Sequence, residues 1–228
     1  AEEGTPYVFA ALRILREQLG GRTALLGFAG APFTLACYLI EGKPSREFPR
    51  AKAMLYGEPE LWHSLMERLT TVTIDYLLAQ AGAGADAVQL FDSWLGLLDQ
   101  ETFRHAVLPY TQRIFAAVSP HVPAIHFSTG TDTLLEDIGR SGCQAVSIDW
   151  RTTLASAQSR LPDQVAIQGN LDPALMLAPW PVIDRAAGSL LLQARRRRGY
   201  TFNLGHGVLP DTDPAKLAKL VTLVHQRP

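Results

Sequence analysis

A histidine between two glycines is the side chain best suited to chemistry in this sequence. His206 stands in the run 203–207 (NLGHG), directly after a stretch that reads as a β-strand. The flanking glycines let the backbone bend sharply, and an imidazole gains or loses a proton near neutral pH. We therefore interpret His206 as the strongest functional candidate, although a simple turn residue would give the same pattern.

Other polar side chains follow further strand-like stretches. They are Tyr38, Asp92, Ser93, His126, Ser128, Asp149, Asn170 and Asp172. The carboxyl ends of parallel strands meet on one side of a fold, so we expect these side chains to converge there. Each also has a structural interpretation: Ser93, Asp92 and Asp149 could cap helices or anchor loops, and Tyr38 could be a core residue with a solvated hydroxyl.

Aromatic residues and cysteines complete the survey of side chains. On sequence grounds Phe28, Phe91 and Trp94 favour packing within the barrel over stacking on a ligand. A zinc site is not expected, because neither Cys-x-x-Cys nor His-Glu-x-x-His occurs. Without a Gly-x-Ser-x-Gly run, a serine hydrolase is not favoured either. Cys37 and Cys143 are too few for a disulfide framework and indicate a reducing compartment.

Apolar strand-like segments alternate with helical patterns along the chain. The strand segments are 23–29, 86–92, 123–128, 145–149, 165–169 and 200–205. The helical segments are 7–19, 32–41, 60–81, 100–118, 131–141, 151–159, 180–196 and 214–226. Nearly continuous apolar strands are typical of parallel sheets. The repeated strand-helix order therefore predicts an α/β fold, either doubly wound or closed as a barrel.

The phosphate-binding loops of doubly wound folds are missing. Neither Gly-x-Gly-x-x-Gly nor a Walker A run occurs, and 82–84 (GAG) precedes a strand as a helix end would. The sequence therefore favours a (β/α)8 TIM barrel, with about six of the eight βα units represented. We expect residues 1–228 to form a single barrel domain that lacks the N-terminal strands.

The composition excludes several partner classes. The 228 residues carry 21 Lys+Arg and 22 Asp+Glu, a net charge of −1. Nucleic-acid and membrane-surface proteins usually carry a one-signed excess, so neither partner is expected. The basic run 195–198 fits a solvated helix end. The uncharged run 23–40 is broken by glycines and a proline, so it does not read as a membrane span, and the first residues do not read as a secretory signal.

Several long motifs resemble the uroporphyrinogen decarboxylase family. They are 27–35 (GFAGAPFTL) with Tyr38 and 41–42 (EG), 89–94 (QLFDSW) with 108–110 (LPY), 168–173 (QGNLDP), and 203–207 (NLGHG) with 210–214 (PDTDP). The likeness runs from about Tyr7 to the C-terminus. Long motifs in the right order are far more specific than a single short pattern.

The resemblance implies a cytoplasmic (β/α)8 barrel, commonly a homodimer, that works without metal or organic cofactor. The family removes carbon dioxide from the four acetate side chains of uroporphyrinogen III, a tetrapyrrole of haem biosynthesis, to give coproporphyrinogen III. Matched by position, Tyr38, Ser93 and His206 fall on residues that contact the substrate, with Tyr38 and His206 as the catalytic candidates. Phe28 and Phe91 fall on apolar pocket walls.

One part of the family pattern has no counterpart in this sequence. The family carries an N-terminal arginine-rich motif that grips the substrate carboxylates, and an aspartate that faces the pyrrole nitrogens. That aspartate fits the chemistry, because loss of carbon dioxide needs a protonated pyrrole as electron sink. Only Arg151 and His206 offer cationic donors at the strand ends. We therefore expect residues 1–228 alone to have negligible decarboxylase activity.

Two alternatives stay open. The corrinoid-linked methyltransferases resemble the same barrel but hold zinc with a His-x-Cys run and a later Cys. Here 126–128 reads HFS and His206 stands at the later position, a poor donor set for thiol activation. The other alternative is a non-catalytic porphyrinogen-binding relative, against which the presence of Tyr38, Ser93 and His206 argues.

Overall fold

The computed structural model describes residues 4–43, 45–195 and 199–226. Within them, parallel strands lie in one sheet in chain order: β1 (Leu26–Gly30), β2 (Ala87–Asp92), β3 (Ala124–Ser128), β4 (Ala145–Ser147), β5 (Ala166–Leu171) and β6 (Tyr200–Leu204). A sheet whose order follows the chain without reversal is the wall of a barrel and not a doubly wound sheet. The predicted α/β class with six parallel strands is confirmed.

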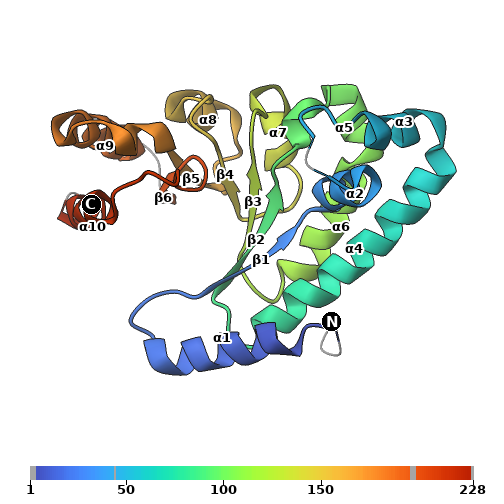
Figure 1. Ribbon diagram of the computed structural model, residues 1–228, viewed down its shortest axis with the longest axis horizontal. Coiled ribbons are helices and arrows are strands. Elements are labelled where there is room, and N and C mark those ends of the chain that lie inside the picture. The colour runs from blue at the N-terminus through green and yellow to red at the C-terminus, as the bar shows by residue number, and fades with distance from the viewer. Residues whose placement is uncertain (1–3, 44, 196–198, 227–228) are drawn as a thin grey trace.

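Helices follow the strands. They are α1 (Pro6–Leu19), α2 (Pro32–Glu41), α3 (Pro49–Gly57), α4 (Pro59–Gly82), α5 (Gln100–Ala106), α6 (Leu108–Val118), α7 (Leu135–Gly139), α8 (Leu154–Arg160), α9 (Trp180–Ala194) and α10 (Pro214–Gln226), with 3-10 turns η1 (Leu95–Leu97), η2 (Asp132–Leu134) and η3 (Pro173–Leu177). Figure 1 shows the long α4 beside α6 at one end of the molecule, and α9 and α10 together at the other. None of the described helices is long and apolar enough to cross a membrane.

The main core lies between the sheet and the helices. Val88 and Leu90 of β2 point into it, where they meet Met66 of α4 and Ile114 of α6, all of them buried. Their burial explains why strand and helix segments could be recognised from apolar runs. The inner face of the sheet is therefore left for the site.

The predicted helix 100–118 is two helices. The break falls at Val107, because Pro109 has no N–H and cannot continue the hydrogen-bond pattern of α5. Helix α3 was not predicted; it begins with Pro49 at its first position and carries little apolar periodicity. The segment 131–141 contains only the turn η2 and the short α7.

Side-chain amides occupy part of both sheet edges. Ala31 N–H donates to Phe91 O, so alternate residues of β1 face β2 and Phe28 faces the free edge. There Gln80 of α4 donates to Phe28 O (2.8 Å) and accepts from Phe28 N–H (2.9 Å). At the other edge, Leu204 N–H donates to Asn203 Oδ1 (2.9 Å). These bonds satisfy backbone groups that face no neighbouring strand in the described residues.

Candidate active site

Alternate residues of the central strands divide between the helices and the inner face. On β2, Leu90 and Asp92 are buried against the helices, whereas Gln89 and Phe91 line a cavity on the other side. On β3, Phe127 lines the same cavity. This alternation follows from the two-residue period of a strand.

A cavity of about 330 Å³ opens at the carboxyl ends of β2, β3 and β6. Its lining residues are Gln89, Phe91, Ser93, Phe127, Asn203, Leu204, His206, Gly207 and Val208. The structure thus brings together three residues predicted from the sequence, Phe91, Ser93 and His206. Active sites of parallel barrels lie at this end of the strands.

Four rings form a row across the inner face. The ring centroids lie 5.7 Å apart for Phe28 and Phe91, 5.2 Å for Phe91 and Phe127, and 5.8 Å for Phe127 and His206, each pair edge to face. Phe28 is 61% exposed and packs on Phe91 alone among the described aromatic rings, so the predicted barrel packing is not seen for most of its surface. The row offers an apolar surface that ends in an exposed imidazole.

A buried polar cluster without charge joins the cavity lining at Gln89. Gln168 Nε2 donates to Gln89 Oε1 (2.9 Å) and to Ser147 Oγ (3.0 Å), and all three residues are buried. These bonds hold the amides in fixed positions. Among the cavity-lining residues, His206 is the one that carries an imidazole.

Tyr38 lies outside this cavity. It projects from α2, is 46% exposed, and packs edge to face on Trp94 with centroids 6.3 Å apart. Trp94 also packs on Phe48 at 4.9 Å, so its predicted packing role is confirmed. Tyr38 therefore contacts Trp94, which follows Ser93 in the chain, but Tyr38 itself is not part of the cavity lining.

Three residues expected at the rim face the helices instead. Asp92 and His126 are fully buried, and Ser128 is buried with its hydroxyl 2.7 Å from that of Thr131. Asp92 Oδ1 accepts from Thr34 Oγ1 (2.8 Å), while Oδ2 lies 4.0 Å from His126 Nε2. Neither ring nitrogen of His126 has a hydrogen-bond partner in the described residues. Phe127, one residue on from His126, takes the inner position that sequence reasoning missed.

Burial controls the ionisation of these groups. Desolvation raises the pKa of Asp92 to about 7, partly offset by the Thr34 hydrogen bond, and lowers the pKa of His126 to about 4. Burial also raises the pKa of Cys37 to about 12 and of Cys143 to about 11, so both thiols are unreactive near neutral pH. In the described part of the chain, no three His, Cys, Asp or Glu residues are arranged to hold a metal ion.

Further strand-end residues anchor loops. The carboxylate of Asp149 accepts from Gly130 N–H (2.8 Å), which confirms its interpretation as a loop anchor. Asn170 Nδ2 donates to the carbonyls of Asp149 and Thr152, and Asp172 caps η3. Ser93 caps no helix, which leaves its hydroxyl at the cavity.

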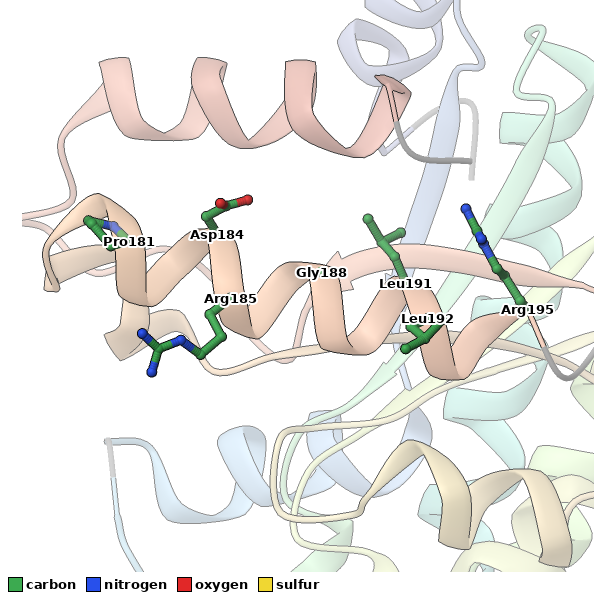
Figure 2. A pocket seen from close by; sticks show the side chains of 7 residues that line it. All are labelled: Pro181, Asp184, Arg185, Gly188, Leu191, Leu192 and Arg195. Atoms are coloured by element: carbon green, nitrogen blue, oxygen red, sulfur yellow. The ribbon is translucent and has the colours of Figure 1, made fainter.

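A larger hollow of about 600 Å³ lies along α9. It is lined by Pro181, Asp184, Arg185, Gly188, Leu191, Leu192 and Arg195. Figure 2 shows that these residues come from α9 and the residue directly after it, and that Asp184 and Arg185 point to opposite sides of the helix. Arg195 belongs to the basic run 195–198, of which 196–198 lie outside the described residues. We place the site at the smaller cavity, where several elements converge.

Comparison with known sequences identifies related proteins. Residues 1–227 match the family model for "Uroporphyrinogen decarboxylase (URO-D)". Proteins named uroporphyrinogen decarboxylase from Salinispora tropica and Thermobifida fusca are each 50% identical and cover 99% and 98% of this chain. The chain spans 61% and 62% of their respective lengths.

Comparison with solved structures agrees on the fold. A methyltransferase from Methanosarcina mazei superposes with a TM-score of 0.84 at 20% identity, over 97% of this chain and 64% of that one. A B12-independent methionine synthase from Shewanella sp. W3-18-1, in complex with selenomethionine, gives 0.63 at 10% identity, over 96% and 65%. At these identities the likeness shows the fold alone, and it supports the barrel-type architecture.

Proposed function

Because the chain belongs to the uroporphyrinogen decarboxylase family, we propose that it builds the active-site cavity of an enzyme that removes carbon dioxide from the acetate side chains of uroporphyrinogen III. The product of four such steps is coproporphyrinogen III. The observation that carries the proposal is the row of aromatic rings that ends at His206 beside Ser93. We further propose that residues 1–228 form one barrel domain of a cytoplasmic homodimer, which sedimentation and cell fractionation would test.

The cavity fits a ligand with an apolar centre and an acidic rim. Phe28, Phe91 and Phe127 offer ring faces and edges to a tetrapyrrole, while the buried amide of Gln89 carries no charge to repel it. The Ser93 hydroxyl can donate a hydrogen bond to a carboxylate. Tyr38, whose ring is half exposed, is proposed to contact the substrate beyond Trp94.

The reaction requires proton transfer and charge stabilisation. Protonation of a pyrrole carbon makes that ring an electron acceptor. The bond between the acetate methylene and its carboxylate then breaks, the electron pair moves into the ring, and carbon dioxide leaves. A second proton completes the methyl group, and loss of the first proton from the ring carbon restores the pyrrole, so each step consumes one proton. His206 is placed to supply a proton or to hold a substrate carboxylate, because it is the titratable side chain that reaches the cavity.

The test is an anaerobic assay with uroporphyrinogen III, followed by separation of the oxidised porphyrins. Protein expressed from the complete gene should convert the octacarboxylate through intermediates with seven, six and five carboxylates to the tetracarboxylate. Residues 1–228 expressed alone should show negligible turnover. Failure of the complete protein to release carbon dioxide would overturn the proposed function.

A further inference from the structure

A second, smaller compartment adjoins the cavity. It has a volume of about 190 Å³ and is lined by Ser93, Trp94, Gly96, Leu97, Thr129, Gly130 and Arg151. Ser93 lines both spaces, so a ligand in the main cavity can extend one arm past it. The compartment is smaller than typical small-molecule sites of about 300–1,000 Å³, which suits a side chain of the ligand better than a macrocycle.

Two turns form the walls of this compartment at close contact. A Cβ atom on Gly96 would lie 2.4 Å from Thr129 O and 2.7 Å from Gly130 O, so only glycine fits there. Thr129 Oγ1 also donates to Ser93 O (2.7 Å). The turns after β2 and β3 are therefore fixed against each other, and they fix the position of the Ser93 backbone.

The guanidinium of Arg151 is held in place before any ligand arrives. Its Nη1 donates to Asp149 Oδ2, the same oxygen that accepts from Gly130 N–H, and Asp149 Oδ1 accepts from Arg151 N–H (2.9 Å). The guanidinium carbon also lies 4.4 Å from the centroid of the Trp150 ring. Asp149 is nearly fully buried, whereas 56% of the Arg151 side chain is exposed. The Arg151 guanidinium is therefore anchored on one side and open to solvent on the other, and its remaining N–H groups can bind a ligand.

We propose that Arg151 and the Ser93 hydroxyl form a carboxylate subsite that takes one acidic arm of the substrate. The inference rests on the proposed function and adds a cationic contact to a cavity whose described lining has no Arg or Lys. An arginine fork can bind both oxygens of a carboxylate, and Ser93 can donate a further hydrogen bond. None of the hydrogen bonds found among the described residues occupies the Ser93 hydroxyl. The subsite therefore distinguishes ligands by the acidic arm that they place beside Ser93.

The experiment uses protein expressed from the complete gene and three variants. Arg151→Met removes the charge but keeps much of the side-chain length. Arg151→Lys keeps the charge but loses the paired N–H donors of the guanidinium. Arg113→Met is the matched control, because Arg113 is a half-exposed arginine on α6 that pairs with Glu67. Thermal unfolding of each variant establishes that it is folded.

We expect Arg151→Met to raise KM for uroporphyrinogen III about tenfold, with kcat changed less than about twofold, since a charge-assisted hydrogen bond contributes about that much to binding. Arg151→Lys should recover part of the loss, and Arg113→Met should match the wild type. Fluorescence quenching with uroporphyrin III should show the same order of affinities.

The outcomes separate the two proposals. Wild-type protein that turns over uroporphyrinogen III, together with a folded Arg151→Met variant of unchanged KM and affinity, overturns the subsite alone. An equal loss in Arg113→Met would also overturn it, because the effect would then be one of general charge. Wild-type protein that neither binds uroporphyrin III nor decarboxylates uroporphyrinogen III overturns the proposed function and the subsite together.

Discussion

Strands β2 and β3 carry different chemistry on their two faces. On the inner face, Phe91 and Phe127 border a cavity that reaches the exposed His206. On the outer face, Asp92 and His126 are fully buried beneath the helices, with Asp92 Oδ2 and both His126 nitrogens lacking hydrogen-bond partners in the described chain. Adjacent residues of the two strands therefore supply a binding surface on one face and a buried titratable pair on the other.

The difference teaches that a titratable side chain next to a site need not belong to it. A buried acid or base changes its pKa and so makes folding depend on pH, whereas an exposed imidazole at a cavity is available to a substrate. Substitutions on the outer face should alter stability, and substitutions on the inner face should alter turnover.

The largest effect should come from Asp92→Asn. The folded-state pKa of Asp92 is raised from 3.8 to about 7, so the protonated form is favoured and wild-type stability falls as pH rises from about 4 to 7. Asparagine cannot ionise and can still accept from Thr34, so the variant should gain up to about 4 kcal/mol in the free energy of unfolding at pH 8. At pH 4 the free energy of unfolding of the variant should differ little from that of the wild type. Urea unfolding at pH 4 and pH 8 measures both values. A similar gain in the exposed control Asp163→Asn would contradict this account.

His126→Phe should give the next largest effect. The pKa of His126 is lowered from 6.5 to about 4, so the neutral form is favoured and its contribution to stability is lost as pH falls from about 6.5 to 4. Phenylalanine removes that loss, which amounts to about 3 kcal/mol, and suits a site beside Phe115. Urea unfolding at pH 7 and pH 4 measures the difference. His105→Phe, at an exposed position on α5, should keep the wild-type pH dependence.

On the inner face, His206→Ala should lower kcat/KM for uroporphyrinogen III by about a hundredfold, or about 2.7 kcal/mol, if the imidazole transfers a proton. Because His206 is exposed, the free energy of unfolding should stay within about 0.5 kcal/mol of wild type. The exposed His121→Ala is the matched control for both measurements. Unchanged turnover in His206→Ala would remove His206 from the mechanism.

Phe28→Ala should give the smallest effect. Loss of this exposed ring should weaken binding of uroporphyrin III about fivefold, or about 1 kcal/mol, because one aromatic contact in the row is lost. Stability should change little. The exposed Leu39→Ala on α2 serves as the control, and fluorescence titration provides the comparison. Equal affinities of Phe28→Ala and wild type would show that the substrate does not reach β1.

The fold could be predicted from the sequence more completely than the direction of individual side chains. Apolar runs located the strands, since burial on one or both faces requires them. The run 124–128 (AIHFS) does not alternate clearly between polar and apolar residues, so nothing in it showed that Phe127 and not His126 faces inward. That choice depends on the packing of His126 against Phe115 of α6, a tertiary contact that the residue pattern of the strand does not encode. The proline at position 109, by contrast, was a signal available to local reasoning that divides 100–118 into two helices.

The side-chain amides of Gln80 and Asn203 affect whether two copies of this chain can associate through the edges of their sheets. An edge strand with open N–H and C=O groups is a template on which another chain can add a strand and begin to aggregate. Side chains already engage both groups of Phe28 and the N–H of Leu204. A strand from a neighbouring molecule would first have to displace an amide at either edge. In residues 1–228 taken alone, the two side chains therefore hinder edge-to-edge aggregation, one at each end of the six-stranded sheet.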